Sequence, residues 1–129
     1  MTCPECAAPL VAFTVPDDVA AHVPEESASL ALCSRCLALV ASPPPTGAPE
    51  FDRVSEAFPE GDAGAAMAVG VGLLDSLALH RTDIEALFSF VEANGYDPLL
   101  VVDRLARQGS IQTPIDLDRR RHQLEQLME

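Results

Sequence analysis

The sequence contains no lysine and no tryptophan, only three isoleucines, and 5% aromatic residues among its 129 positions. It also has no long hydrophobic run, since the longest stretch free of polar side chains covers only residues 63–74. Because a membrane-spanning helix needs about 20 apolar residues, that stretch is typical of a buried helix, and we expect no membrane contact. The N-terminus lacks the basic start and apolar segment of a secretory signal, so we expect a cytoplasmic protein.

Patterns typical of catalysis are also missing. No Ser-His-Asp or Cys-His nucleophile arrangement is recognisable, and Gly70-Val71-Gly72 lacks the third glycine and the preceding strand of a dinucleotide-binding fingerprint. His80 and Asp83 are close in sequence, but without a third converging ligand they indicate a polar helix junction rather than a metal site. We therefore expect that the protein is not an enzyme and has no small-molecule substrate.

The charge is strongly one-sided. Twenty acidic residues accompany eight basic ones, all arginine, which gives a net charge of −12. With 48% hydrophobic and 22% charged residues, the chain otherwise has the composition of one globular domain, or of a small domain with an appendage. Acid excess, missing lysine and abundant alanine are typical of a protein from a high-salt cytoplasm, where salt screens the repulsion among the acids. An acidic protein from a GC-rich mesophile is the alternative.

The four cysteines carry the most specific signal. They form two pairs of identical spacing, Cys3-Pro4-Glu5-Cys6 and Cys33-Ser34-Arg35-Cys36, separated by residues 7–32. A C-x2-C turn presents two sulfurs on one side of a tight loop, and two such turns supply four thiolates that close a tetrahedral Zn²⁺ site. We predict that one structural Zn²⁺ is bound by Cys3, Cys6, Cys33 and Cys36, with no open position for water or substrate.

Two other interpretations of the cysteines remain open. A redox C-x-x-C pair is placed at a helix N-terminus after a buried strand, and neither pair has that context. Iron or an iron–sulfur cluster also accepts four cysteines. His22 lies between the two pairs, but with four sulfurs available we interpret it as a loop residue rather than a ligand.

Strand-like segments, residues 9–15, 27–32 and 37–40, alternate with the cysteine pairs. In this order, residues 1–41 resemble a zinc ribbon. Cys3-Pro4-Glu5-Cys6 is similar to the first knuckle of the small zinc-finger proteins of halophilic archaea, which often carry Gly where this chain has Ala7. The whole chain resembles an uncharacterised haloarchaeal family of short acidic proteins with such a ribbon at the N-terminus. The resemblance implies zinc but no particular activity, because ribbons serve many functions.

Residues 42–59 are predicted to be a proline-rich linker followed by a short arm. Three consecutive prolines at 43–45 favour an extended, semi-rigid segment. Phe51, Val54 and Phe58 share one face of a short helix, which we interpret as an arm packed on the C-terminal body. A hydrophobic docking motif for a partner is the alternative interpretation.

Residues 60–129 are predicted to form a helical bundle. A first helix, from Asp62 to about Leu79, is apolar on nearly all sides and should be central, with neighbouring helices packed closely on its glycines. Three further helices begin at capping signals, namely a capping box at residues 82–85, Asp97-Pro98 and Asp116. The predicted fold class is α+β, with a zinc ribbon at 1–41, a linker and arm at 42–59, and a helical domain at 60–129.

The arginine run at residues 119–121 is the strongest basic grouping. Asp116 is four residues from Arg120, and Arg121 is four residues from Glu125, so we interpret the run as a salt-bridged surface. We therefore expect a small zinc-binding interaction or regulatory module whose partner is another protein. The alternative is a nucleic-acid-associated ribbon protein of transcription or translation, which would use Arg35 and the arginine run, although the net charge disfavours it.

Overall fold

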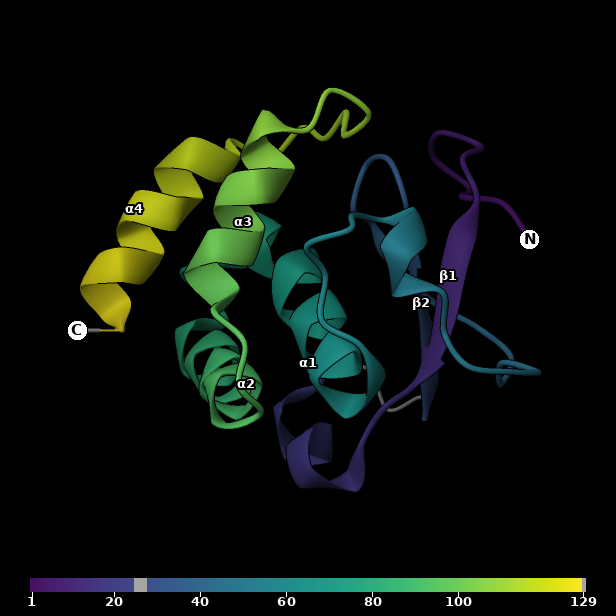
Figure 1. Cartoon of the computed structure of the whole chain (residues 1–129), viewed down its shortest axis with the longest axis horizontal. Helices are drawn as coiled ribbons and strands as arrows, with labels where there is room; N and C mark the ends of the chain where they lie inside the picture. Colours follow the sequence, from purple (N-terminus) through teal and green to yellow (C-terminus); the bar gives the residue numbers. More distant parts are fainter. Residues whose placement is uncertain (25–27, 129) are drawn as a thin grey trace.

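The structure, a computed structural model, describes residues 1–24 and 28–128. It is mixed α+β, as the sequence predicts, with a three-stranded sheet followed by helices (Figure 1). Ser27, predicted to begin the second strand, lies outside the described residues. The strands are β1 (Leu10–Thr14), β2 (Ser29–Cys33) and β3 (Leu39–Ala41).

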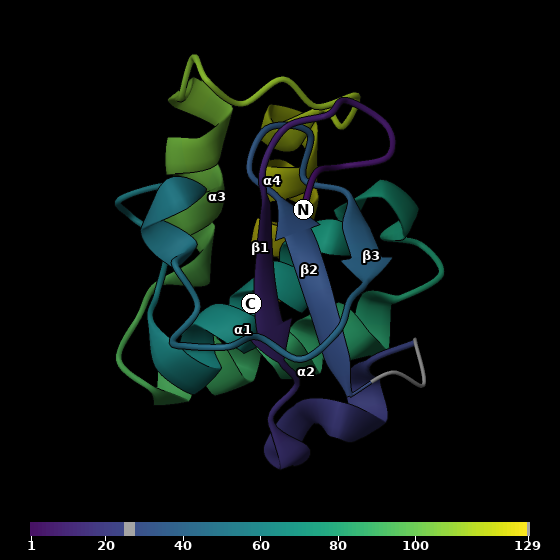
Figure 2. The same cartoon turned by 90° about the vertical axis from the view of Figure 1, so that its right-hand side faces the viewer.

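The sheet is antiparallel, in the order β1-β2-β3. Its register pairs Val11 with Leu32 and Leu32 with Leu39. Val11 and Phe13 alternate with less buried neighbours along β1, which is the period of a strand with one face turned to the core. After β3 the chain crosses in front of the sheet before it reaches the helices (Figure 2).

Besides the strands, the described residues 1–24 and 28–128 form four α-helices and three short 3-10 segments. These elements are η1 (Asp17–His22), η2 (Phe51–Arg53), α1 (Gly61–Gly72), η3 (Leu74–Ser76), α2 (Arg81–Ala93), α3 (Pro98–Arg107) and α4 (Leu117–Leu127). α1 packs against α2, and α3 packs against α4. Figure 1 places α1 between the sheet and the outer helices, and residues 63–71 are buried on every side, as the sequence predicts.

Two helix boundaries differ from the predicted ones. α1 ends at Gly72 rather than near Leu79, because the N–H of Leu73 is shared between the carbonyls of Val69 and Gly70 and the chain tightens into η3. α2 begins before the expected capping box. His80 is its N-cap, and its carbonyl accepts the N–H of Ile84, so Thr82 lies inside the first turn and caps nothing.

The arm at residues 51–58 packs into the protein. Phe51 and Phe58 stack with ring centroids 5.5 Å apart, and Phe51 also contacts Phe13 of β1 at 5.8 Å. Both rings and Val54 are buried. The helix expected here is reduced to the single turn η2. The packed arm is therefore the interpretation that the structure supports, and the exposed docking motif is not formed by these side chains.

One hydrophobic core joins the sheet to the helices. It includes Phe13 and Leu30 of the sheet, Phe51 of the arm, and Met67 and Phe88 of the helices. The division at residues 1–41, 42–59 and 60–129 stays a prediction about chain organisation, but side chains from all three segments share this core.

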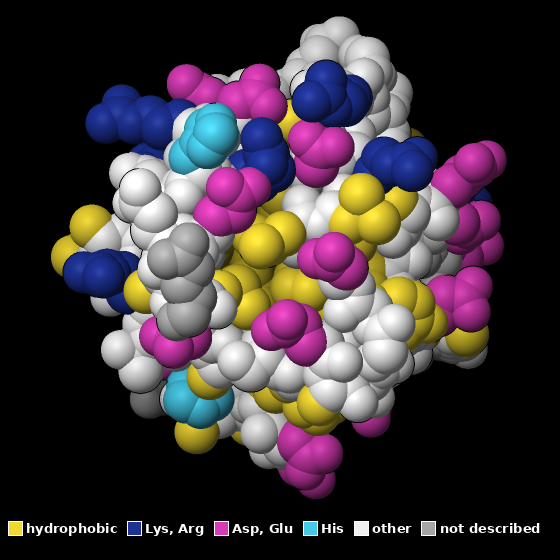
Figure 3. Space-filling view, turned by 60° about the vertical axis from the view of Figure 1, so that its left-hand side comes forward, with side chains coloured by type: hydrophobic (Ala, Val, Ile, Leu, Met, Phe, Trp, Pro, Cys, Tyr) yellow, Lys and Arg dark blue, Asp and Glu magenta, His cyan; other side chains and the backbone are white. Residues whose placement is uncertain are grey.

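The surface is rich in acids. Figure 3 shows the side of the molecule that carries α4, where hydrophobic side chains gather in the centre of the face among scattered Asp and Glu, with arginines mostly toward one edge. Within the two described segments of the chain, none of the helices combines the length and apolar composition that a membrane crossing requires.

Candidate metal centre

Two tight turns, here called the first knuckle (residues 3–8) and the second knuckle (residues 33–38), have matching backbone geometry. The N–H of Cys3 donates to the carbonyl of Ala8 at 2.8 Å, and the N–H of Cys33 donates to that of Ala38 at 2.8 Å. The residue after the second cysteine is left-handed in both turns, with φ of 63° at Ala7 and 64° at Leu37. The C-x2-C spacing thus produces the same turn twice.

The knuckles bring all four sulfurs together. The Sγ atoms of Cys3, Cys6, Cys33 and Cys36 lie within 4.8 Å of one another. Across the two knuckles, Cys3 Sγ is 3.7 Å from Cys36 Sγ, and Cys6 Sγ is 3.4 Å from Cys33 Sγ. A tetrahedral ion with metal–sulfur bonds of about 2.3 Å places its sulfurs about 3.8 Å apart. The spacing therefore fits four ligands of one ion, whereas a disulfide needs about 2.05 Å.

Backbone N–H groups point at the sulfurs of the second knuckle. The N–H groups of Arg35 and Cys36 donate to Cys33 Sγ at 3.4 and 3.3 Å. Such donors stabilise a thiolate and hold the turn in the conformation that presents its sulfurs. Cys33, at the end of β2, is also fully buried.

The thiols of Cys6, Cys33 and Cys36 have different environments, which shift their pKa values in different directions. A backbone hydrogen bond from Ala8 lowers the pKa of the Cys6 thiol to about 7. Burial raises the pKa of the Cys36 thiol to about 12 and also raises the pKa of Cys33. A cation bound among the four sulfurs would favour their thiolate forms and release protons from the high-pKa thiols.

The second knuckle is also attached to the rest of the molecule. Ser34 donates to the carbonyl of Pro9 twice, from its N–H at 3.1 Å and from its hydroxyl at 2.8 Å. The N–H of Gln112, in the connection between α3 and α4, donates to the carbonyl of Arg35 at 2.9 Å. The knuckle is therefore bonded to the residue before β1 on one side and to the α3–α4 connection on the other, and the sequence did not indicate the second contact.

The structure places the two histidines around Asp83, and His22, which the sequence suggested was a loop residue, lies in a 3-10 segment. His22 lies in η1, away from the sulfurs, and its Nδ1 is 3.2 Å from Asp83 of α2. His80 Nδ1 is 3.6 Å from the other oxygen of the same carboxylate. Asp83 thus joins η1 to the start of α2. The pairing of His80 with Asp83 was expected from their spacing, and the approach of His22 could come only from the fold.

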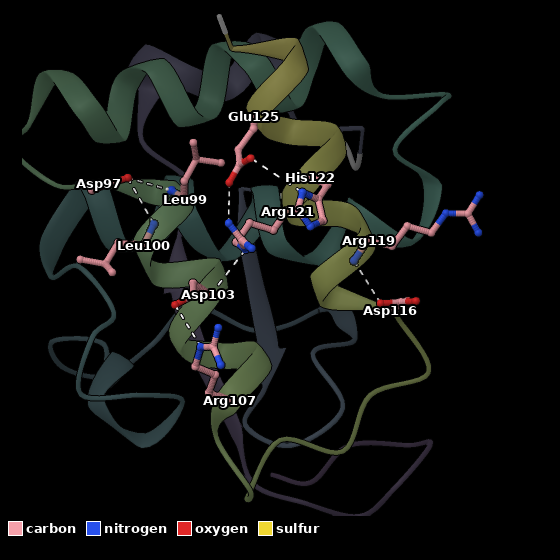
Figure 4. A network of polar contacts seen from close by, with 10 residues as sticks. All are labelled: Asp97, Leu99, Leu100, Asp103, Arg107, Asp116, Arg119, Arg121, His122 and Glu125. Atoms are coloured by element: carbon pink, nitrogen blue, oxygen red, sulfur yellow. Dashed lines mark hydrogen bonds and ion pairs between the residues drawn. The ribbon is translucent and has the colours of Figure 1, made fainter.

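The arginine run forms some of the predicted contacts. Arg121 pairs with Glu125, as expected, and also with Asp103 of α3 at 3.5 Å (Figure 4). Asp116 does not pair with Arg120 as predicted, because its carboxylate accepts the N–H of Arg119 at 3.1 Å and so caps α4. Arg120 instead donates to the side chain of Gln123 at 2.8 Å.

Comparison with known proteins gives one result. The model of a family of unknown function, DUF6276, matches residues 2–128. No curated protein and no solved structure matches the chain.

Proposed function

The chain belongs to the DUF6276 family of unknown function, and on that premise we propose that it is a small interaction or regulatory module built on a structural four-cysteine zinc site. The observation that carries the proposal is the convergence of four sulfurs within 4.8 Å. Four thiolates complete the coordination of Zn²⁺, so no position is left for water or substrate. A metal held in this way supports a fold and performs no chemistry, which favours a protein that is not an enzyme.

Zinc is the proposed ion because it tolerates the tetrahedral arrangement without a redox reaction, although iron also accepts four cysteines. Residues 1–41 would then be a zinc ribbon. Such a segment of about 40 residues has too little core to fold alone, and in finger peptides structural zinc contributes on the order of 10–16 kcal/mol. Here the second knuckle would pass part of that stability to the helices through the contact between Arg35 and Gln112.

We propose that the binding partner is another protein, on the basis of apolar side chains exposed at the surface. Tyr96 and Leu100 are exposed around the start of α3, and Figure 4 shows Leu100 pointing away from the polar network between α3 and α4. A contiguous exposed apolar patch marks a contact with another protein, and we propose that Tyr96 and Leu100 belong to such a patch. The net charge of −12 supports the further proposals of a cytoplasmic location and a haloarchaeal source.

The nucleic-acid alternative rests on fewer arginines than the sequence suggested. Arg121 is held by Asp103 and Glu125. Arg35 and Arg119 are exposed, and Arg35 lies on the second knuckle. Arg120 also forms no ion pair with the described residues, but a few such arginines on a chain of net charge −12 are a weak basis for binding phosphates.

The metal is tested by elemental analysis of the protein purified without chelator. We expect one zinc per chain, and we expect Cys33→Ser to lose it, while Ser34→Ala in the same knuckle keeps it. Hydrogen exchange then follows the Gln112 amide, which should exchange faster after zinc removal because its acceptor on the second knuckle moves. Zinc content that is unchanged in Cys33→Ser would contradict the proposed site.

The partner is tested by affinity purification from a native high-salt lysate treated with nuclease. A protein that is retained by the wild type and by Leu79→Glu, but lost with Leu100→Glu, supports the interaction surface, because both leucines are exposed but lie on different segments. Nuclease-sensitive retention that is lost with Arg35→Ala would instead favour the nucleic-acid alternative.

A further inference from the structure

A second candidate site lies on the side of the helical part where α4 approaches the start of α2. A cavity of about 320 Å³ opens there. It is lined by Leu77, Ala78, Arg81, Arg120, Gln123, Gln126 and Leu127. No cysteine and no carboxylate is among these residues, so the cavity is separate from the metal centre.

The charge of this cavity is opposite to that of the protein. Two of the eight arginines line it, although the chain carries 20 acids. Arg53, Arg107 and Arg121 each pair with a carboxylate. Neither Arg81 nor Arg120 forms an ion pair with any residue in the described parts of the chain. Arg81 also lines an adjoining hollow with Asp83 and Glu85, but neither guanidinium is engaged by a carboxylate of the described residues, so both can attract an anion into the cavity.

The polar groups around the arginines are arranged as donors. Arg120 is half-buried, and its Nη1 donates to Gln123 Oε1 at 2.8 Å. That bond uses the acceptor of Gln123, so its amide nitrogen remains as a donor. It also fixes the guanidinium of Arg120, which lowers the entropy lost when a ligand binds. The fork of an arginine fits the two oxygens of a carboxylate or phosphate.

The start of α2 adds positive electrostatic potential to the cavity. Arg81 is the first residue of the helix, and no side chain caps its N-terminus. The N–H groups of an uncapped first turn carry partial positive charge, of which the carboxylate of Asp83 in the same turn offsets a part. On the other side of the cavity, Leu77 is buried and Leu127 is half-buried, so part of the lining is apolar.

We propose that this cavity, between residues 77–81 and α4, binds an oxyanion, a carboxylate or a phosphate, carried on a small apolar group. The arginines and the amide of Gln123 hold the oxyanion, and Leu77 and Leu127 contact the apolar group. The same chemistry occurs in a free small molecule and in the C-terminal carboxylate of another protein. The site does not depend on the metal centre, so zinc content reports separately on the proposed function.

The test is calorimetric titration of the zinc-loaded protein with inorganic phosphate, butyl phosphate, hexanoate, and a leucine-terminated tripeptide in free and amidated forms. We expect saturable binding with one site per chain, tighter for butyl phosphate than for inorganic phosphate. Arg120→Gln and Arg81→Gln should each weaken binding about tenfold or more, because each removes charge-assisted hydrogen bonds. Arg119→Gln, on the exposed side of α4, should leave the affinity unchanged.

The peptide pair separates the two sources of the oxyanion. Tighter binding of the free peptide than of hexanoate and butyl phosphate, with loss on amidation, assigns the site to a protein C-terminus. Tighter binding of butyl phosphate or hexanoate assigns it to a small molecule. Binding that is absent with every probe, or equal in Arg119→Gln and Arg120→Gln proteins of normal zinc content and circular dichroism, would overturn the proposal.

Discussion

Ala7 and Leu37 occupy the same position in the two knuckles, and both are left-handed. This conformation costs an L-residue about 1–2 kcal/mol, a cost that glycine does not have. The small haloarchaeal zinc-finger proteins that the first knuckle resembles often carry glycine at this position. The structure thus gives a physical reason for that glycine, and it shows that this chain keeps the turn without it.

Replacing these two residues by glycine should change stability in opposite directions. Ala7→Gly removes the strain and one exposed methyl group, while glycine adds about 0.4–1 kcal/mol of unfolded-state entropy, so we expect a net gain of about 0.5–1 kcal/mol. Leu37→Gly removes the same strain but also a fully buried side chain, whose loss costs about 2–5 kcal/mol, so it should destabilise. Denaturant unfolding of the zinc-loaded proteins measures both, and a destabilised Ala7→Gly would contradict the strain.

The sequence predicted contacts between residues that are close together in the chain. Each pair of sulfurs is set by a local turn, and the caps at Asp97 and Asp116 form as expected, whereas the pairing of β1 with β2 brings the two pairs together. The capping box at Thr82 was wrong because the compact turn before α2 starts the helix at His80. The contact of Gln112 with the second knuckle joins residues that are distant in sequence, and no local pattern encodes it.

At the scale of the element, α1 shows why a helix can be rich in glycine. A Cβ built on Gly64 would lie 2.4 Å from the carbonyl oxygen of Pro59, and one built on Gly70 would lie 2.3 Å from the ring of Phe88. The close packing predicted from neighbouring helices is present at Gly70, whereas at Gly64 the arm before α1 supplies it. Each glycine destabilises the helix by about 1 kcal/mol relative to alanine, but it allows neighbouring residues to approach the helix backbone.

Gly64→Ala should consequently destabilise the protein although alanine favours helices. We expect a loss of about 1–3 kcal/mol, because the added methyl group must displace a backbone carbonyl or the buried ring of Phe51. Gly109→Ala is the matched control, since nothing lies within 4 Å of its Cβ position and its φ is ordinary. The control should be neutral or slightly stabilising. Thermal unfolding compares the two, and a Gly64→Ala protein as stable as wild type would refute the close approach.

Element types were easier to predict than element lengths. Periodicity and caps identified the strands and the four helices, but the end of α1 and the short η2 depended on how the chain turns back onto its own core. The arm shows the same limit. Its three apolar side chains are buried, as expected. However, the chain forms a single turn and then a bend, instead of a regular helix, and in this conformation Phe51 stacks on Phe58.

At the scale of the whole molecule, the net negative charge should make the stability depend on salt. Twelve uncompensated negative charges repel one another in the folded state. Raising KCl from 0.1 to 1 M shortens the screening length from about 10 Å to about 3 Å. We therefore expect the melting temperature to rise by several degrees over that range, where about 1 kcal/mol corresponds to about 3–6 °C for a chain of this size.

A variant with fewer acids separates screening from other effects of salt. Glu56, Glu60 and Glu92 are exposed and form no ion pair within the described residues. Replacing all three by glutamine should raise the melting temperature at 0.1 M KCl and reduce its dependence on salt. An equal salt dependence in the variant and the wild type would show that repulsion among the acids is not the cause.

The burial of α1 on every side also limits how this chain can be divided. One side of the helix faces the sheet, where Leu39 lies against Gly72, and the other faces Phe88 of α2. A truncated fragment that starts at residue 60 would expose the first of these sides to water, and an apolar strip of that kind promotes self-association. Expressing the helices alone should therefore yield aggregates rather than a miniature of the native protein.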